Sequence, residues 1–183
     1  LEDTLDIWDM QLLQYGESII KRRSQFIEEI GETVTKVNEN LTGNKEHLQM
    51  LYEPDVTIDE FANKLNNYRE RDKKLFSTSV GPHRDDLCFM NKDIDIRKYG
   101  SQGQQRTCAL SLKLAEIEIV KNMTGDSPVL LLDDVLSELD AGRQSWLLES
   151  IQDIQTLISC TGLDDFVNSR ISLDKVFRVK EGI

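Results

Sequence analysis

Residues 128–140, PVLLLDDVLSELD, constrain the fold and the function of this chain more than any other segment. The four apolar residues 129–132 are typical of a short buried strand, and the adjacent carboxylates Asp133 and Asp134 follow it directly. Open α/β sheets bind their ligands at the carboxyl ends of their strands. We therefore predict that Asp133 binds Mg²⁺ and that Asp134 orients or deprotonates an attacking water.

A second motif, residues 99–106 (YGSQGQQR), lies at the start of a long helical pattern. Gly103 lets the backbone approach an oxyanion, the Ser101 hydroxyl can cap the helix and bind a phosphate oxygen, and the first helical amides carry partial positive charge. An ordinary N-cap with a capping Gln104 has the same sequence, and residues 137–140 alone also read as an N-cap. Only the combined order of the three motifs indicates a nucleotide site.

The loop that cradles nucleotide phosphates, G-x-x-x-x-G-K-[ST], does not occur anywhere in the 183 residues. The chain begins at Leu1 without a methionine and enters a helical pattern at once, as an excised C-terminal portion would. We expect the phosphate loop to lie upstream in a longer protein. The chain alone is then expected to be catalytically inactive and to bind ATP weakly.

The net charge of −11 opposes a general attraction to polyanions, so DNA binding would need a local basic patch. Residues 21–23 and 69–74 are candidates, although such clusters are more often solvated helix faces. The three cysteines have no paired spacing, which predicts reduced thiols in the cytoplasm without a disulfide or a metal cluster. No apolar run approaches the ~20 residues of a membrane span, so no membrane partner is expected.

Apolar periodicity and turn residues predict the secondary structure. We expect helices at 5–41, 57–74, 103–123 and 142–151, and strands at 47–52, 86–90, 93–97, 129–132, 156–160 and 176–179. Thr57 and Glu60 should form a capping box. The alternation of strands and helices predicts an α/β fold with a mostly parallel sheet. Residues 1–76 are expected to form a helical arm apart from residues 77–183, although the arm helices could instead pack within the same core.

Four sequence blocks carry a resemblance to a known family: GPHRDDL (81–87), YGSQGQQRT (99–107), LSLKLAEIE (110–118) and LLLDDVLSELD (130–140). Together they resemble the ATP-binding-cassette superfamily, on the branch of DNA-repair and chromosome-maintenance ATPases. Within that branch they are similar to the RecF family of bacterial recombination mediators. The resemblance covers roughly the C-terminal half of the chain. It implies the C-terminal lobe of a P-loop ATPase head, with residues 1–76 as its inserted helical lobe.

The resemblance also implies how the motifs act. Two subunits of such ATPases close head to tail over two ATP molecules, so the residues of one subunit complete the site of the other. The implied roles are metal binding for Asp133, catalysis for Asp134, contact with the γ-phosphate across the dimer for Ser101, Gly103 and Gln104, and the dimer seam for Ser137 and Asp140. The implied cofactors are ATP and Mg²⁺. The implied partners are double-stranded or gapped DNA, a RecR-like mediator and a second copy of the protein.

Two departures from the superfamily pattern predict slow hydrolysis. Asp134 stands where most cassette ATPases have glutamate, and residues 159–162 (SCTG) replace their histidine switch, leaving Thr161 as a weak candidate phosphate sensor. His83 and Arg84 could contact phosphate or position a loop. Two other functions stay open, an energy-coupling subunit of a transporter and a non-catalytic module that docks a partner; Val135, where transporters usually have proline, favours the DNA-repair branch.

Overall fold

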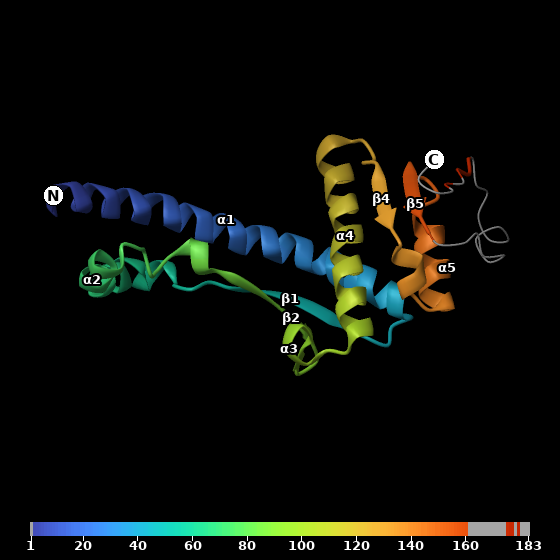
Figure 1. The fold of residues 1–183 in the computed structure, drawn as a ribbon, viewed down its shortest axis with the longest axis horizontal. Helices are drawn as coiled ribbons and strands as arrows, with labels where there is room; N and C mark the ends of the chain where they lie inside the picture. Colours follow the sequence, from blue (N-terminus) through green and yellow to red (C-terminus); the bar gives the residue numbers. More distant parts are fainter. Residues whose placement is uncertain (1, 161–174, 178, 180–183) are drawn as a thin grey trace.

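A single long helix forms the spine of the molecule (Figure 1). The computed structural model describes residues 2–160, 175–177 and 179. Helix α1 (Glu2–Thr42) confirms the first predicted helix and ends where Gly43 and Asn44 adopt the left-handed conformation, with φ of 62° and 59°. The Asn44 amide donates to the Glu39 carbonyl at 2.7 Å and closes the last turn. In the part of the chain that the structure describes, no helix is long and apolar enough to cross a membrane.

An antiparallel sheet of three strands lies along α1. Its central strand β2 (Asp86–Asn91) pairs with β1 (Leu48–Glu53) on one side and with β3 (Ile94–Asp95) on the other. The β2–β3 hairpin was predicted, but the strand expected at 93–97 is too long. The Asp95 carboxylate accepts a hydrogen bond from the Arg97 amide at 3.0 Å, and this cap starts the short helix α3 (Ile96–Tyr99) instead.

Helix α2 (Ile58–Leu75) packs beside the N-terminal half of α1 (Figure 1). The helix itself was predicted correctly, but the capping box at its start was wrong. Thr57 caps no backbone amide, and its hydroxyl instead donates to the Glu60 carboxylate at 3.1 Å. The helix ends at Phe76, which is left-handed with φ 51°.

The other end of α1 carries the α/β part of the fold. It contains α4 (Gln102–Thr124), β4 (Leu130–Asp133), the turn η2 (Val135–Glu138), α5 (Ala141–Ser150) and β5 (Thr156–Ser159). Strands β4 and β5 are parallel, with Leu132 opposite Ile158, so the α/β class is confirmed. Of the strand expected at 176–179, Val176, Phe177 and Val179 are described and none lies in a strand, whereas Arg178 lies outside the described residues.

Apolar side chains gather in two clusters. We call the larger one the head core; it joins the last third of α1 to α4, β4 and α5 around buried residues such as Val34, Leu147 and Leu148. The smaller one, the arm core, consists of Ile20, Val56, Phe61 and Val80, with Leu12, Leu13 and Tyr52 packed against it. Helix α1 contributes to both clusters, so its two ends are held by different sets of contacts.

Candidate nucleotide-facing site

The carboxylates Asp133 and Asp134 lie where β4 ends, and both are exposed. The last residue of β5, Ser159, fastens them in place. Its hydroxyl donates to Asp133 Oδ1. The Asp134 amide donates to the Ser159 carbonyl and approaches its hydroxyl oxygen, each at 3.1 Å. The parallel pairing of β4 with β5 therefore positions the carboxylate pair, as predicted for the carboxyl end of a sheet.

Asp134 has the left-handed backbone conformation, with φ 50° and ψ 19°. This conformation costs a non-glycine residue about 1–3 kcal/mol and persists only where the surroundings enforce it. Ser137 helps to enforce it, because its hydroxyl donates to the Asp134 carbonyl at 2.8 Å. The strain turns the chain out of the strand directly after the two carboxylates. Residues with strained backbones of this kind concentrate at functional sites, so the strain makes Asp134 a candidate functional residue.

The carboxylate oxygens of Asp133 and Asp134, at the end of β4, suit a hard cation such as Mg²⁺. Asp133 uses one carboxylate oxygen to accept from Ser159, and its other oxygen has no hydrogen-bond partner among the described residues. In the ranges that the structure describes, no cluster of three or more acidic, histidine or cysteine side chains could hold a metal by itself. Magnesium at nucleotide sites is commonly bound by one or two carboxylates together with phosphates. The residues therefore fit a metal shared with a nucleotide.

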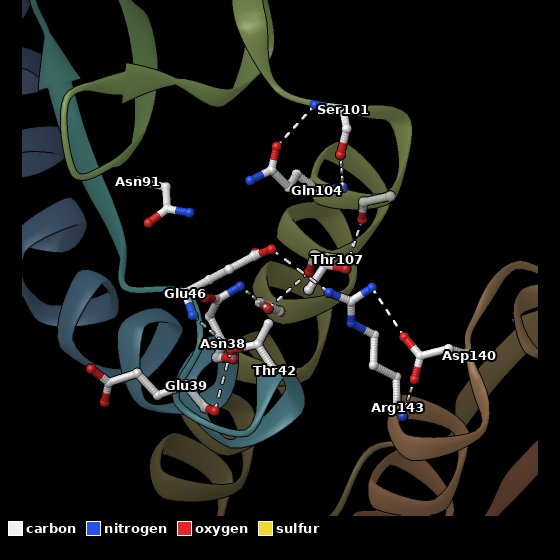
Figure 2. A network of polar contacts seen from close by, with 12 residues as sticks. Asn38, Glu39, Thr42, Glu46, Asn91, Ser101, Gln104, Thr107, Asp140 and Arg143 are labelled. Atoms are coloured by element: carbon white, nitrogen blue, oxygen red, sulfur yellow. Dashed lines mark hydrogen bonds and ion pairs between the residues drawn. The ribbon is translucent and has the colours of Figure 1, made fainter.

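Residues 101–104, the signature turn, start α4 (Figure 2). Ser101 Oγ accepts from the Gln104 amide at 3.2 Å, and Gln104 Oε1 accepts from the Ser101 amide at 3.0 Å. These two bonds complete a capping box. Gly103 is exposed, and a Cβ added to it would meet only Ser101 Oγ, at 4.0 Å. The packing of this chain does not require glycine at position 103, so the absence of a side chain leaves the turn open to a group from outside.

An ion pair connects the signature turn to the carboxylate pair. Arg106, one helical turn into α4, has its Nη2 3.1 Å from Oε1 of Glu138 in η2. Glu138 follows Asp134 by four residues, so the start of α4 and the segment after β4 lie on the same side of the head. Sequence reasoning missed both partners of this pair, although Arg106 belongs to the signature block.

Asp140 is the N-cap of α5. The helix therefore begins at Ala141, three residues later than it would if Ser137 were the cap. Its Oδ1 accepts from the amides of Gly142 and Arg143 at 3.0 and 3.1 Å. The hydrogen bond from the Arg143 amide, helped by the charge of Arg143, lowers the pKa of Asp140. The Arg143 guanidinium lies between two carboxylates, 3.3 Å from Asp140 and 3.7 Å from Glu46 (Figure 2). Neither Arg143 nor Glu46 was singled out from the sequence.

The structure does not bring His83 and Arg84 to the carboxylate pair. They lie in the turn η1 (Pro82–Arg84), which contacts α1 on the arm side of the molecule. A His83 ring nitrogen lies 2.9 Å from the Thr78 carbonyl, a local structural contact. Arg84 is exposed and lines a polar pocket of about 230 Å³ together with Lys64 and Arg71 of α2. Thr161, the candidate phosphate sensor, lies outside the described residues.

A buried carboxylate next to this turn was missed from the sequence. The Asp85 side chain is only 3% exposed. It accepts from Arg23 Nη1 at 2.7 Å, from the Asp55 amide at 3.1 Å and from the Tyr52 hydroxyl. Burial first, and the hydrogen bond to Asp85 second, raise the pKa of Tyr52 to about 12. We call these four residues the Asp85 cluster. Its members come from α1, β1 and the loops around β1 and β2, so sequence spacing gave no sign of it.

The parallel strands, the carboxylate pair after β4 and the serine-capped α4 define the C-terminal lobe of an ATP-binding-cassette ATPase head. No family model matches the chain. Curated relatives do: the chain is 54% identical over 182 residues to "DNA replication and repair protein RecF" of Lachnospira eligens and 55% identical to the protein of that name from Agathobacter rectalis. Both alignments cover all of this chain and half of the relative.

Solved structures agree with these relatives. A structure of the recombination mediator protein RecF–ATP in the RecFOR pathway matches 88% of this chain and 46% of its own, with 36% identity and a TM-score of 0.77. A RecF–ATPγS structure matches 100% of this chain and 50% of its own, with 35% identity and a TM-score of 0.80. The chain belongs to the RecF family and corresponds to its C-terminal portion. It spans about half the length of the curated relatives it matches.

Proposed function

We propose that this chain is the part of a RecF-type DNA-repair ATPase that closes over ATP held by a second copy of the protein. The observation that carries the proposal is the strained Asp134, fastened beside Asp133 by Ser159 and linked to the signature turn through the Arg106–Glu138 ion pair. The relatives named for DNA replication and repair, and the RecF–ATP structures, support it. They also favour DNA repair over an energy-coupling role in a transporter.

Each motif then has a chemical task. Asp133 would hold Mg²⁺, which supplies charge neutralisation for the phosphates when bound. Asp134 would orient the attacking water, and with a side chain one methylene shorter than glutamate it should do so slowly. The signature turn would bind the γ-phosphate of the second copy through the amides at the start of α4, with Gly103 allowing close approach. Ser137 and Asp140 would line the seam between the two copies.

Calorimetry with Mg-ATP tests the division of labour between this chain and the rest of the protein. The isolated chain contains no phosphate loop and offers only the signature turn to the γ-phosphate. We expect no binding in the micromolar range. A micromolar dissociation constant for the isolated chain would show that the nucleotide is held here in some other way.

The longer protein that contains this chain tests the catalytic assignment. Asp134→Asn keeps the shape of the side chain and removes its charge, so it should accumulate an ATP-bound dimer, measured by light scattering with Mg-ATP. Asp126→Asn, an exposed carboxylate in the loop before β4, is the matched control and should behave as wild type. An Asp134→Asn protein that stays monomeric with ATP contradicts the assignment.

For the DNA contact we propose the pocket lined by Lys64, Arg71 and Arg84, because three cationic residues and a single acidic one, Asp55, line it on an otherwise acidic chain. Arg84→Gln should weaken binding of double-stranded DNA by the longer protein severalfold and reduce its salt dependence. Lys113→Gln, an exposed cation on α4 that pairs with Glu116, is the control. Equal effects of the two variants would place the DNA elsewhere.

We also propose that the longer protein docks a RecR-like mediator. Pull-down of that mediator by the longer protein tests this part of the proposal.

A further inference from the structure

Four buried polar residues form a row along the contact between α1 and α4 (Figure 2). Thr42 is 6% exposed, Asn38 and Thr107 are 1% exposed, and Ser111 is fully buried. Figure 2 shows Asn38, Thr42 and Thr107 between the signature turn and the Asp140–Arg143 pair. Apart from Asp85, whose side chain is 3% exposed, the buried polar residues in the described part of the chain therefore lie on α1 and α4.

Towards the nucleotide side, the row ends on the signature turn. Asn38 Nδ2 donates to Ser111 Oγ at 3.2 Å, and Ser111 Oγ donates to the Thr107 carbonyl at 2.8 Å. Thr107 Oγ1 then donates to the Gly103 carbonyl at 2.7 Å. These three hydrogen bonds link Asn38, in the contact between α1 and α4, to Gly103 of the signature turn.

In the other direction, the row ends on Asp140. Thr42 Oγ1 donates to the Asn38 carbonyl at 2.8 Å and accepts from the Glu46 amide at 3.3 Å. The Glu46 carboxylate lies 3.7 Å from Arg143, whose guanidinium and amide both bind the carboxylate of Asp140. Glu46 and Arg143 are 17% and 22% exposed, so this ion pair is largely shielded from solvent.

Stability alone gives a poor reason for the row. Well-packed apolar residues are usually at least as stabilising as buried polar groups, and an unpaired buried acceptor costs about 1–3 kcal/mol. Asn38 Oδ1 is such an acceptor, with no hydrogen-bond partner among the described groups. Buried polar rows do, however, specify one relative position of the elements they join, because each bond requires its own geometry.

We infer that Asn38 and Arg143 are positioning residues. Through the C-terminal end of α1, they hold the signature turn and Asp140 in fixed positions relative to each other. Asn38 does so by linking α1 to α4, and Arg143 by linking the start of α5 to the loop after α1. A shift of α1 then moves both loops together. This inference rests on the proposed function, since it assigns the two loops to the closure of a nucleotide site.

Asn38→Leu in the longer protein is the decisive variant. Ser111 continues to donate to the Thr107 carbonyl, so the substitution leaves no new buried donor unpaired and removes the unpaired acceptor. We expect the melting temperature to be unchanged or higher, whereas the ATP concentration needed for dimerisation should rise about fivefold or more. Val34→Ala, at a fully buried position one turn earlier on α1, should lower the melting temperature without changing the ATP dependence. Wild-type ATP dependence in Asn38→Leu overturns the inference.

Amide hydrogen exchange separates this inference from the proposed function, because it needs no dimer. In Asn38→Leu, exchange should accelerate at residues 103–107. It should change less at Gly142 and Arg143, because Thr42 donates to the backbone carbonyl of position 38, which the substitution keeps. Glu46→Gln keeps the backbone bond to Thr42 and weakens only the ion pair with Arg143, so it should affect 142–143 first. Unchanged exchange at residues 103–107 in Asn38→Leu overturns the inference, whereas a wild-type protein that does not dimerise with ATP overturns the proposed function alone.

Discussion

The arm core and the head core differ in how they are held together. Among the described residues, the head core combines 18 buried residues, from α1, β1, β2, α3, α4, β4, η2, α5 and positions next to them, whereas the arm core has four. The arm core therefore removes less apolar surface from water than the head core does. The arm depends in addition on the Asp85 cluster, whose hydrogen bonds connect α1, β1 and the turn before β2. The head thus rests mainly on apolar burial, and the arm on a small apolar contact locked by a buried carboxylate.

The largest expected effect comes from the centre of the arm core. Phe61 is fully buried and packs against Gly16, where an added Cβ would lie 2.4 Å from its ring. Phe61→Ala should cost about 3–5 kcal/mol, and because the head core is separate, the loss should appear as opening of the arm. Hydrogen exchange should accelerate in α2 and stay slow in α4. Leu147→Ala, at a fully buried position of the head core, should do the reverse. Equal acceleration of both helices would show a single cooperative unit.

A smaller loss is expected when the Asp85 cluster loses its charge. Asp85→Asn weakens the bonds from Arg23, Tyr52 and the Asp55 amide, and hydrogen bonds to a charged group contribute about 1.5–3 kcal/mol. Since the Arg23 side chain is 46% exposed, we expect about 2 kcal/mol, measured by urea unfolding with a probe in the arm. The adjacent Asp86→Asn removes an exposed carboxylate and should change little. If the two variants unfold alike, the cluster does not hold the arm.

Alkaline pH should weaken the arm through Tyr52. Its pKa is raised from 10.0 to about 12, so the folded state keeps the phenol proton longer than the unfolded state does. This contribution is complete below pH 10, and the free energy of unfolding should fall as the pH rises from 10 to about 12. Tyr52→Phe should lose about 1 kcal/mol at pH 7 and remove this alkaline decline. In Tyr68→Phe, at a partly exposed position on α2, the decline should persist.

The smallest effect is a difference in thiol reactivity that reports on the head core. Burial, with a smaller contribution from Glu46, raises the pKa of Cys108 to about 11, and its side chain is 7% exposed. Alkylation of Cys108 at pH 8 should therefore be slow compared with that of the exposed Cys160. Phe61→Ala should leave the Cys108 rate unchanged if the arm opens independently. A faster rate in Phe61→Ala would mean that the head core opens with the arm.

Most elements of the fold could be predicted because their signals are local. Apolar periodicity indicated α1 and α4, and the parallel strands β4 and β5 appeared as short apolar runs within a few residues of their bounds. The serine cap of α4 was also visible in the sequence. The errors have local causes as well. The Thr57 hydroxyl donates to the Glu60 carboxylate and caps no amide, and the cap at Asp95 shortened β3 into a helical turn.

The candidate site was predicted as a set of residues and not as an arrangement. A buried strand followed by two carboxylates is a statement about neighbours in the chain, and the physical chemistry of strand ends was enough to single out Asp133 and Asp134. The hydrogen bonds that hold Asp134 and Asp133 come from Ser159 on the partner strand β5, 25 and 26 residues away in the chain. The Asp85 cluster and the Asn38–Ser111 bond join positions 62 and 73 residues apart. Such contacts depend on where folded elements meet, and residue spacing along an unfolded chain carries no information about that. Local chemistry therefore decided which groups are available, and tertiary packing alone decided which of them touch.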